Sequence, residues 1–243
     1  MITQIIIDDS NGIRYTNDLH YPEAEQSLLA EQAMLNSLFP RLDYCLSKEA
    51  VKEWELYINS FSGIRISKKI WAVLNATQYP NSKYNAGASQ NVDLDYADVK
   101  VIQPNGRSGV GVKVNVRSIL IDTNVYKVLF TPSDIIIKNG KTKLKYRYED
   151  INVYPTTTRF VERGRPAKDA VFVENTWQYV NCDGTPDRRF RDNYQVPVYL
   201  YGELVFWGNR FCLTLGTSNK NVTWNAAVAF QRYKEYVMHK RLR

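Results

Sequence analysis

The sequence predicts a mainly β fold of the α+β class: an antiparallel barrel or sandwich, preceded by helices and followed by one C-terminal helix. Short segments rich in β-branched residues and tyrosine recur from residue 99 onward. Glycine and proline separate these segments, and no helical pattern lies between them, which argues against a doubly wound α/β fold. The 243 residues are 44% hydrophobic, which is enough for a substantial core.

The first forty residues predict a hairpin and a helix. Residues 5–7 and 13–15 are strand-like segments on either side of Asn11-Gly12, and Asn-Gly supplies the positive φ angles of a tight two-residue turn. Pro22 is tolerated in a first helical turn. The apolar residues after it recur at helical spacing until Pro40, where the helix is expected to end.

A second helix is expected to begin after Ser47, a good N-cap, and to end at Gly63. Its apolar positions recur at helical spacing and are Ala50, Val51, Trp54, Tyr57, Ile58 and Phe61. We therefore divide the chain into an acidic region at residues 1–63 and a basic, β-rich domain at residues 64–243 that includes the C-terminal helix.

Residues 64–77 are predicted to form the first strand of this domain. Residues 78–98 are rich in Asn, Ser, Tyr and Asp and are predicted to form a long loop. After the strands, a C-terminal helix is expected, capped by Thr223 or Asn225. Its apolar stripe consists of Ala226, Ala229, Phe230, Tyr233 and Val237.

Charge is distributed unevenly along the chain. Residues 1–60 hold four Lys or Arg against ten Asp or Glu, and the remainder holds 28 against 15, so the two parts carry net charges of −6 and +13. A body this basic attracts polyanions such as nucleic acid, anionic lipid or an acidic protein face. The alternative interpretation is an ordinary soluble surface of mixed charge with a small excess of cations and no polyanion partner, since moderately basic globular proteins are common.

Composition argues against several kinds of site. Cys45, Cys182 and Cys212 are odd in number and widely spaced, which fits neither a disulfide framework nor a structural zinc site. No apolar segment approaches the roughly 20 residues that span a bilayer. The N-terminus lacks the basic start of a secretory signal, so a cytoplasmic location is expected. No metal or cofactor is predicted.

Common catalytic arrangements are also poorly represented. His20 and His239 are the only histidines and lie near the ends of the chain, so a Ser-His-Asp or Cys-His arrangement would need one of them. Gly109-Val110-Gly111 lacks the third glycine and the following helix of a dinucleotide-binding motif. It is therefore interpreted as a strand or turn glycine pair.

Residues 181–194, NCDGTPDRRFRDNY, hold the densest set of candidate site residues. Guanidinium groups give bidentate contacts to phosphate, and an adjacent aromatic ring can stack on a base. The candidate ligand-binding residues are Arg188, Arg189, Phe190 and Arg191. The structural interpretation, which we favour, has Asp183-Gly184 forming a hairpin turn, Asp187 pairing with an arginine, and Phe190 packing under the sheet.

A metal-dependent phosphodiesterase centred on Asp187 and Glu203 is the alternative for the same region. Restriction-type nucleases hold metal with an Asp and with a second acid that is followed two residues later by Lys. Glu203 follows Pro186-Asp187 at a permissible distance, but Val205 stands where the Lys is expected. This alternative predicts that the two carboxylates converge within metal-bridging distance.

Several motifs together resemble the signature of a family of uncharacterised bacterial proteins. They are NAGAS at 85–89, FTPSDIII at 130–137, TTTRFVE at 156–162 and TWQYVNCDGTPDRRF at 176–190. Thr185 stands where that family usually has a second glycine, and the resemblance implies no activity. Residues 126–153 also resemble the hairpin of pleckstrin-homology-like modules, in which one strand ends in Thr-Pro and the next turns at Asn-Gly.

The sequence therefore predicts a non-catalytic recognition module, pleckstrin-homology-like in architecture, whose basic face binds a protein or a nucleic acid. A membrane surface and a second copy of the chain are further partners that the charge distribution permits. Two alternatives stay open. One is the metal-dependent phosphodiesterase or nuclease of Asp187 and Glu203. The other is a subunit of a bacterial defence or phage anti-defence assembly, in which the acidic helices of one copy dock on the basic body of another.

Overall fold

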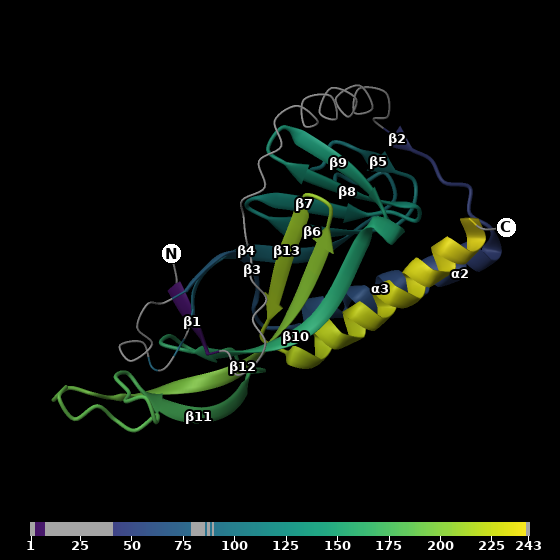
Figure 1. The fold of residues 1–243 in the computed structure, drawn as a ribbon. Coiled ribbons are helices and arrows are strands. Elements are labelled where there is room, and N and C mark those ends of the chain that lie inside the picture. The colour runs from purple at the N-terminus through teal and green to yellow at the C-terminus, as the bar shows by residue number, and fades with distance from the viewer. Residues whose placement is uncertain (1–2, 8–40, 79–85, 87, 89, 242–243) are drawn as a thin grey trace.

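The computed structural model describes residues 3–7, 41–78, 86, 88 and 90–241 of the chain (Figure 1). This part is mainly β, as predicted, with one antiparallel sheet of eleven strands, a separate two-stranded pair and two α-helices. The closed pleckstrin-homology-like barrel is not confirmed. The predicted turn at Asn11-Gly12 and the predicted helix after Pro22 lie outside the described residues.

The sheet consists of β1 (Thr3–Ile7), β3 (Ile70–Gln78), β4 (Gln90–Ile102), β6 (Ser118–Thr123), β7 (Tyr126–Phe130), β8 (Asp134–Asn139), β9 (Thr142–Arg147), β10 (Ile151–Val161), β11 (Val171–Trp177), β12 (Gln195–Gly208) and β13 (Phe211–Thr217). The short pair, which is parallel, consists of β2 (Arg41–Leu42) and β5 (Lys113–Val114). The α-helices are α2 (Lys48–Phe61) and α3 (Lys220–Arg241), and two 3-10 turns are η1 (Ser62–Ile66) and η3 (Tyr148–Asp150).

The strands are hydrogen-bonded in the order β1-β10-β12-β13-β3-β4-β6-β7-β8-β9, and β1 also pairs with β4. Strands β4, β6, β7, β8 and β9 form an antiparallel meander. The connection from β4 to β6 contains β5 of the two-stranded pair, and the later connections are short. Strand β11 pairs with β12, and Figure 1 shows these two strands leaving the body at the lower left as an arm.

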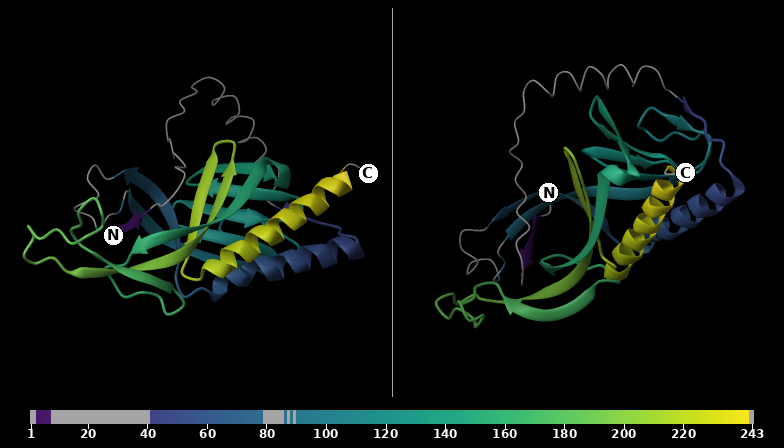
Figure 2. Two further views of the ribbon diagram at one scale, coloured as in Figure 1. Left: turned by 60° about the horizontal axis from the view of Figure 1, so that its bottom comes forward. Right: turned by 45° about the vertical axis from the view of Figure 1, so that its right-hand side comes forward.

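Helices α2 and α3 lie side by side across one face of the sheet, which we call the inner face (Figure 2). Alternate strand residues point to this face, and in β7 and β8 these are apolar. The rings of Tyr57 on α2 and Tyr233 on α3 stack with centroids 4.9 Å apart. Aromatic side chains dominate the core between helices and sheet: Trp54, Tyr57, Phe61, Phe130, Tyr148, Phe206, Phe230 and Tyr233.

Two buried tyrosines attach other elements to the turn between β7 and β8. Tyr148 Oη donates to Thr131 O at 2.8 Å, and Tyr233 Oη donates to Pro132 O at 2.9 Å. Burial raises the pKa of both hydroxyls, so both stay protonated and able to donate at neutral pH. The Thr131-Pro132 step, where the sequence predicts the end of a strand, therefore anchors η3 and α3 at one point.

Helix α2 begins where the sequence predicts. Ser47 Oγ accepts from Ala50 N at 3.2 Å, which satisfies one of the amide groups that a helix start leaves unpaired. The predicted strand at residues 64–77 is wrong over its first part, because η1 follows α2 directly and β3 begins only at Ile70. Ile64 is buried in the core shared by α2 and the sheet, whereas Ile66 is 70% exposed.

The predicted loop at residues 78–98 is wrong from Gln90 onward, where β4 begins. Polar Asp93 and Asp95 alternate there with Val92 and Leu94, a period of two that suits a strand with one apolar face. Asn, Ser and Asp lower strand propensity, but pairing with β3 along this segment overrides it.

Helix α3 begins at Lys220, earlier than the predicted caps at Thr223 and Asn225. Asn219 Oδ1 accepts from Asn221 N at 3.1 Å, so Asn219 supplies the first side-chain contact. Thr223 lies within the helix and its hydroxyl donates to Lys220 O at 2.8 Å. The predicted apolar stripe is confirmed as buried: Ala226, Ala229, Phe230, Tyr233 and Val237.

Gly216 gives a test of the packing between β13 and β3. A Cβ added there would lie 2.2 Å from Trp71 Nε1, so Gly216→Ala must displace a buried ring. We expect the free energy of unfolding, measured by urea denaturation, to fall by about 1–3 kcal/mol. Gly63→Ala is the control, since nothing lies within 4 Å of that Cβ. Equal stability of the two variants would contradict this account.

Candidate functional site

Residues 178–194 form the tip of the arm, and many of their hydrogen bonds close within the tip. Gly184 has a φ of +81°, which glycine adopts without steric cost. Thr185 donates to Asp183 Oδ1 from its backbone N at 3.0 Å and from Oγ1 at 2.7 Å, and these bonds lower the pKa of Asp183. The predicted turn at Asp183-Gly184 is present.

Asp187 and Arg189 form the ion pair that the structural interpretation predicts. Asp187 is 3% exposed, and its Oδ1 accepts from Arg189 N at 3.0 Å and from Arg189 Nε at 2.9 Å. Oδ2 accepts from the same guanidinium. A carboxylate held by bidentate bonds from its second neighbour fixes the local backbone, so Asp187 serves the shape of the tip.

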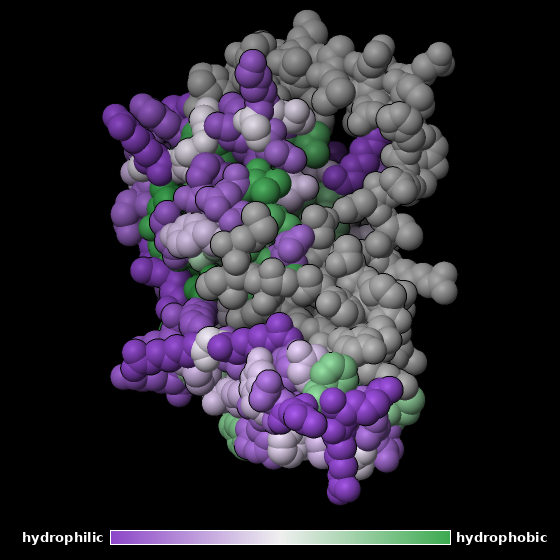
Figure 3. All heavy atoms as spheres, turned by 90° about the vertical axis from the view of Figure 1, so that its left-hand side faces the viewer, coloured by the Kyte–Doolittle hydropathy of each residue, from purple (hydrophilic) through white to green (hydrophobic). Residues whose placement is uncertain are grey.

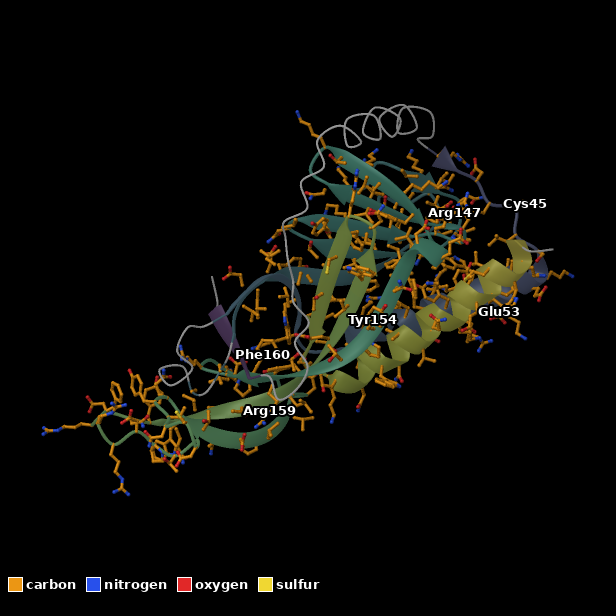
Figure 4. All side chains as sticks on the ribbon, viewed as in Figure 1. Cys45, Glu53, Arg147, Tyr154, Arg159 and Phe160 are labelled. Carbon is orange, nitrogen blue, oxygen red and sulfur yellow. The ribbon has the colours of Figure 1, made fainter. Side chains whose placement is uncertain are left out.

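Phe190 stacks on Tyr179 with ring centroids 4.1 Å apart and an interplanar angle of 14°. The expected place under the sheet is therefore wrong. Arg188, Arg189 and Arg191 are all exposed, and the Arg189 guanidinium is bonded to Asp187. The end of the arm is predominantly hydrophilic in Figure 3, and side chains ending in nitrogen project from it in Figure 4.

The structure does not bring Asp187 and Glu203 together. Trp177 and Gln195 are the last strand pair before the tip that holds Asp187. Glu203 lies eight residues along β12 from Gln195, roughly 26 Å at about 3.3 Å per residue, opposite Thr156 of β10. Carboxylates this far apart cannot share a metal ion. Within the described ranges, no group of three His, Cys, Asp or Glu could hold one.

Glu203 is a buried carboxyl on the face of β12 that points away from the helices. Leu204 and Phe206 belong to the inner core, so alternation places Glu203 on the other face with Tyr201. Burial raises the pKa of Glu203, and a hydrogen bond with Thr158 opposes part of that rise. The residues that pair with Glu203 on the neighbouring strands are Thr156 of β10 and Gly216 of β13. Neither is an acid, so no second carboxylate lies directly opposite Glu203.

A groove of about 390 Å³ lies between α2 and α3. Leu56 and Val228 line it and are 39% and 58% exposed. Arg232 Nη2 lies 3.1 Å from Glu53 Oε2, an ion pair between the helices; Figure 4 labels Glu53. Among the described residues the lining includes Ser60 but neither His nor Cys, so no imidazole lies beside this hydroxyl to act as its general base.

The face of the meander opposite the helices, the outer face, collects cations. In β9, Lys143, Lys145 and Arg147 alternate with Leu144 and Tyr146, which pack on the inner core, so a period of two puts all three cations outside. Residues 96–147 hold ten Lys or Arg against three Asp, a net charge of +7. We call the outer-face cations of these strands the basic face: Lys100, Lys127, Lys138, Lys143, Lys145 and Arg147.

Three residues of the basic face lie directly opposite one another across β7, β8 and β9. Lys127 pairs with Lys138, and Lys138 pairs with Lys143. We call these three the lysine row. Like charges directly opposite in a sheet destabilise it, so this register has a cost that the apolar inner face must offset.

The row continues into two acids on β6 and β4, Asp122 and Asp98. Lys100 Nζ lies 3.1 Å from Asp122 Oδ2 and 3.4 Å from Asp98 Oδ2, and Lys127 Nζ contacts Asp122. Partial burial acts to raise the pKa of Asp122, but hydrogen bonds from Lys127 and Lys100 outweigh it and lower that pKa. Asp122 and Asp98 thus lie at the β4–β6 end of the row, whereas the third aspartate of residues 96–147, Asp134 on β8, pairs with Lys145 Nζ at 3.2 Å.

Residues 109–111, Gly-Val-Gly, form a loop that lies on the lysine row, and we call it the glycine loop. Lys138 Nζ donates to Gly109 O at 3.1 Å. A Cβ at Gly109 would lie 3.1 Å from Lys127 Cδ, and a Cβ at Gly111 would lie 2.9 Å from Lys143 Nζ. The glycines have φ angles of +73° and +78°. The positive φ angles favour glycine at both positions, and a Cβ there would displace the ends of the Lys127 and Lys143 side chains.

The sequence signal for the row is the Asn-Gly turn at 139–140. Asn139 pairs with Thr142 around Gly140 and Lys141, which places Lys138 opposite Lys143. The alternation of Lys with apolar residues in β9 is also visible in the sequence. The contact with the glycine loop has no local signal, because it joins residues about thirty positions apart.

Asp187→Asn tests the role of Asp187 in the tip. The amide removes the charge that holds the Arg189 guanidinium, so the local opening free energy of amides 187–193, measured by hydrogen exchange, should fall by about 1–3 kcal/mol. Asp192→Asn, an exposed neighbour, should leave exchange unchanged. Protection that survives in Asp187→Asn would contradict a structural role.

The raised pKa of Glu203 fixes the sign of a pH effect. The folded state binds this proton more tightly than the unfolded chain does, so the stabilisation is complete below the ordinary pKa of 4.5 and is lost as pH rises through the folded pKa. Glu203→Gln keeps an acceptor for Thr158 and should become more stable than the wild type as pH rises above 4.5. Urea unfolding from about pH 4 to about pH 8 measures the difference.

Glu235→Gln on α3 is the matched control, because Glu235 is exposed and contacts Gln231 on its own helix. It measures the effect of removing an exposed carboxylate at each pH. A Glu203→Gln difference that does not vary with pH beyond that of the control would contradict the buried, proton-binding state of Glu203.

None of the helices in the described ranges is long and apolar enough to cross a membrane. No protein-family model, curated protein or solved structure matches the chain. The resemblance to an uncharacterised bacterial family therefore stays a prediction, and the function is inferred from the arrangement of the chain's own residues.

Proposed function

We propose that the protein is a non-catalytic recognition module whose basic face binds a polyanion, nucleic acid in the first place. The observation that carries the proposal is the lysine row on the outer face of β7, β8 and β9. Cations set side by side on a sheet repel one another, and phosphate groups relieve this repulsion while releasing their own counterions.

The apolar residues of the outer face favour a polymer backbone over an acidic protein. Leu120, Leu129 and Ile136 lie between the cations but are buried, because Val110 and Val114 cover them. A protein interface usually has an exposed apolar centre, which this face lacks in the described part of the chain. Charge without an apolar centre suits phosphate contacts, which position a nucleic acid without reading its sequence.

The arm offers a secondary contact. Arg188 and Arg191 are exposed at its tip, while Arg189 and Phe190 are engaged by Asp187 and Tyr179. Of the four predicted ligand-binding residues, we therefore retain Arg188 and Arg191 as candidates for contact with a polyanion.

The proposal includes a likeness in architecture to pleckstrin-homology-like modules. Two features support it: a C-terminal helix packed on the inner face of antiparallel strands, and a Thr131-Pro132 step that ends β7 and anchors this helix through Tyr233. The likeness concerns architecture and transfers no ligand.

Lys145→Glu combined with Arg147→Glu tests the proposal. Both side chains lie outside the lysine row and are 57% and 64% exposed, but Lys145 Nζ lies 3.2 Å from Asp134 Oδ2 and Arg147 Nη1 lies 3.2 Å from Glu149 Oε1. The replacement therefore removes two ion pairs, and thermal unfolding first establishes that the variant folds. Binding of a labelled duplex oligonucleotide, measured by fluorescence anisotropy, should weaken about tenfold or more. The slope of log K against log salt should become shallower by about 0.9 for each phosphate group that the variant no longer neutralises.

Lys48→Glu combined with Lys52→Glu makes the same charge change on the exposed surface of α2, on the inner side of the sheet, and should leave binding much less affected. An equal weakening of binding in both double variants would show that net charge alone matters and would contradict a defined face. Binding to anionic vesicles but not to the oligonucleotide would overturn the assignment to nucleic acid.

A further inference from the structure

We propose that the glycine loop and the lysine row together form a site for one phosphate-type oxyanion. The inference rests on the proposed function, because it assigns the place on the basic face where a phosphate group is held. Two independent features meet at this place: backbone amides that donate to no acceptor among the described residues, and the side chains of three lysines.

The backbone of the glycine loop has the alternation that anion-binding loops use. The φ angles of Gly109 and Gly111 are positive, and that of Val110 between them is not. Successive amides in such a left–right alternation point into one concavity and attract anions. No acceptor in the described ranges takes the N–H of Gly109, Val110 or Gly111.

Val110 fixes the loop in place. Its side chain is fully buried in the outer apolar cluster with Leu120, Leu129 and Ile136. Ser108 Oγ donates to Val112 O at 3.0 Å and closes the loop around it. The glycine loop is therefore held against β7 and β8 in the absence of a ligand, which reduces the conformational entropy lost on binding.

The lysines supply the charge at the same place. Lys138 Nζ is bonded to Gly109 O, the Lys127 side chain lies against Gly109, and Lys143 Nζ lies beside Gly111. Asp122 contacts Lys127, so the carboxylate lies at the far end of the row from Lys143. An oxyanion at the loop would accept from the amides and from Lys138 and Lys143 together.

Titration of the full-length, ¹⁵N-labelled protein with inorganic phosphate tests the site. The amide resonances of Gly109 and Gly111 should shift and saturate, and chloride at equal ionic strength should not reproduce the shift. Lys138→Gln combined with Lys143→Gln should weaken the apparent phosphate affinity about tenfold, since each replaced ammonium removes a charge-assisted bond. Lys48→Gln combined with Lys52→Gln is the matched control and should leave that affinity unchanged.

Shifts that do not saturate, or that are unaffected by Lys138→Gln and Lys143→Gln, would overturn the site. A second arm compares an oligonucleotide carrying a 5′-phosphate with the same oligonucleotide lacking it. Stronger shifts at the glycine loop with the 5′-phosphate would assign a phosphomonoester, and equal shifts with both would assign an internal phosphodiester. Absence of any shift at Gly109 and Gly111 with either would overturn the site.

The two proposals fail in different ways. If the oligonucleotide binds with the salt dependence of the basic face while inorganic phosphate leaves Gly109 and Gly111 unmoved, the oxyanion site is wrong and the proposed function stands. If phosphate saturates the glycine loop but no oligonucleotide binds, the site stands and the assignment to nucleic acid is wrong.

Discussion

The hydrogen bonds from two buried tyrosines to the β7–β8 turn hold the molecule together at its centre. Tyr233 brings α3 to Pro132, and Tyr148 brings the β9–β10 connection to the adjacent Thr131. A buried hydroxyl without an acceptor would cost free energy, so these bonds fix not only the contact but also the depth at which each ring lies. The sheet, the C-terminal helix and α2, through the stacked ring of Tyr57, are thereby held in one core.

The chemistry of the outer face follows from this core. Once Val128, Phe130, Ile135 and Ile137 must face the helices, the residues between them must face outward. The register of the β8–β9 turn then sets Lys138 against Lys143. A cluster of like charge is thus imposed by apolar packing on the other side of the same strands, and it needs no local attraction to form.

How much could be predicted varied with how local each feature is. Helix α2, its Ser47 cap and the stripe of α3 follow from nearby residues and were predictable. The start of strand β4 was missed because its pairing with β3 overrides a polar composition. The start of α3 was missed because Asn219, which precedes the expected caps Thr223 and Asn225, accepts the first backbone hydrogen bond of the helix. The ion pair of Asp187 and Arg189 was predictable from their spacing. The glycine loop on the lysine row was not, since no short-range pattern shows which distant strands a loop will cover.

The lysine row makes added electrolyte act on the unliganded fold. The Cβ atoms of directly opposed residues in a sheet are about 5 Å apart, which keeps the two ammonium groups near each other. The Debye length falls from about 10 Å at 0.1 M salt to about 3 Å at 1 M salt. Ions therefore shield the repulsion between Lys138 and Lys143 progressively over this range. The same ions compete with the basic face for the polyanion. Concentrated electrolyte should therefore raise the free energy of unfolding of the unliganded protein while it lowers the affinity for the polyanion.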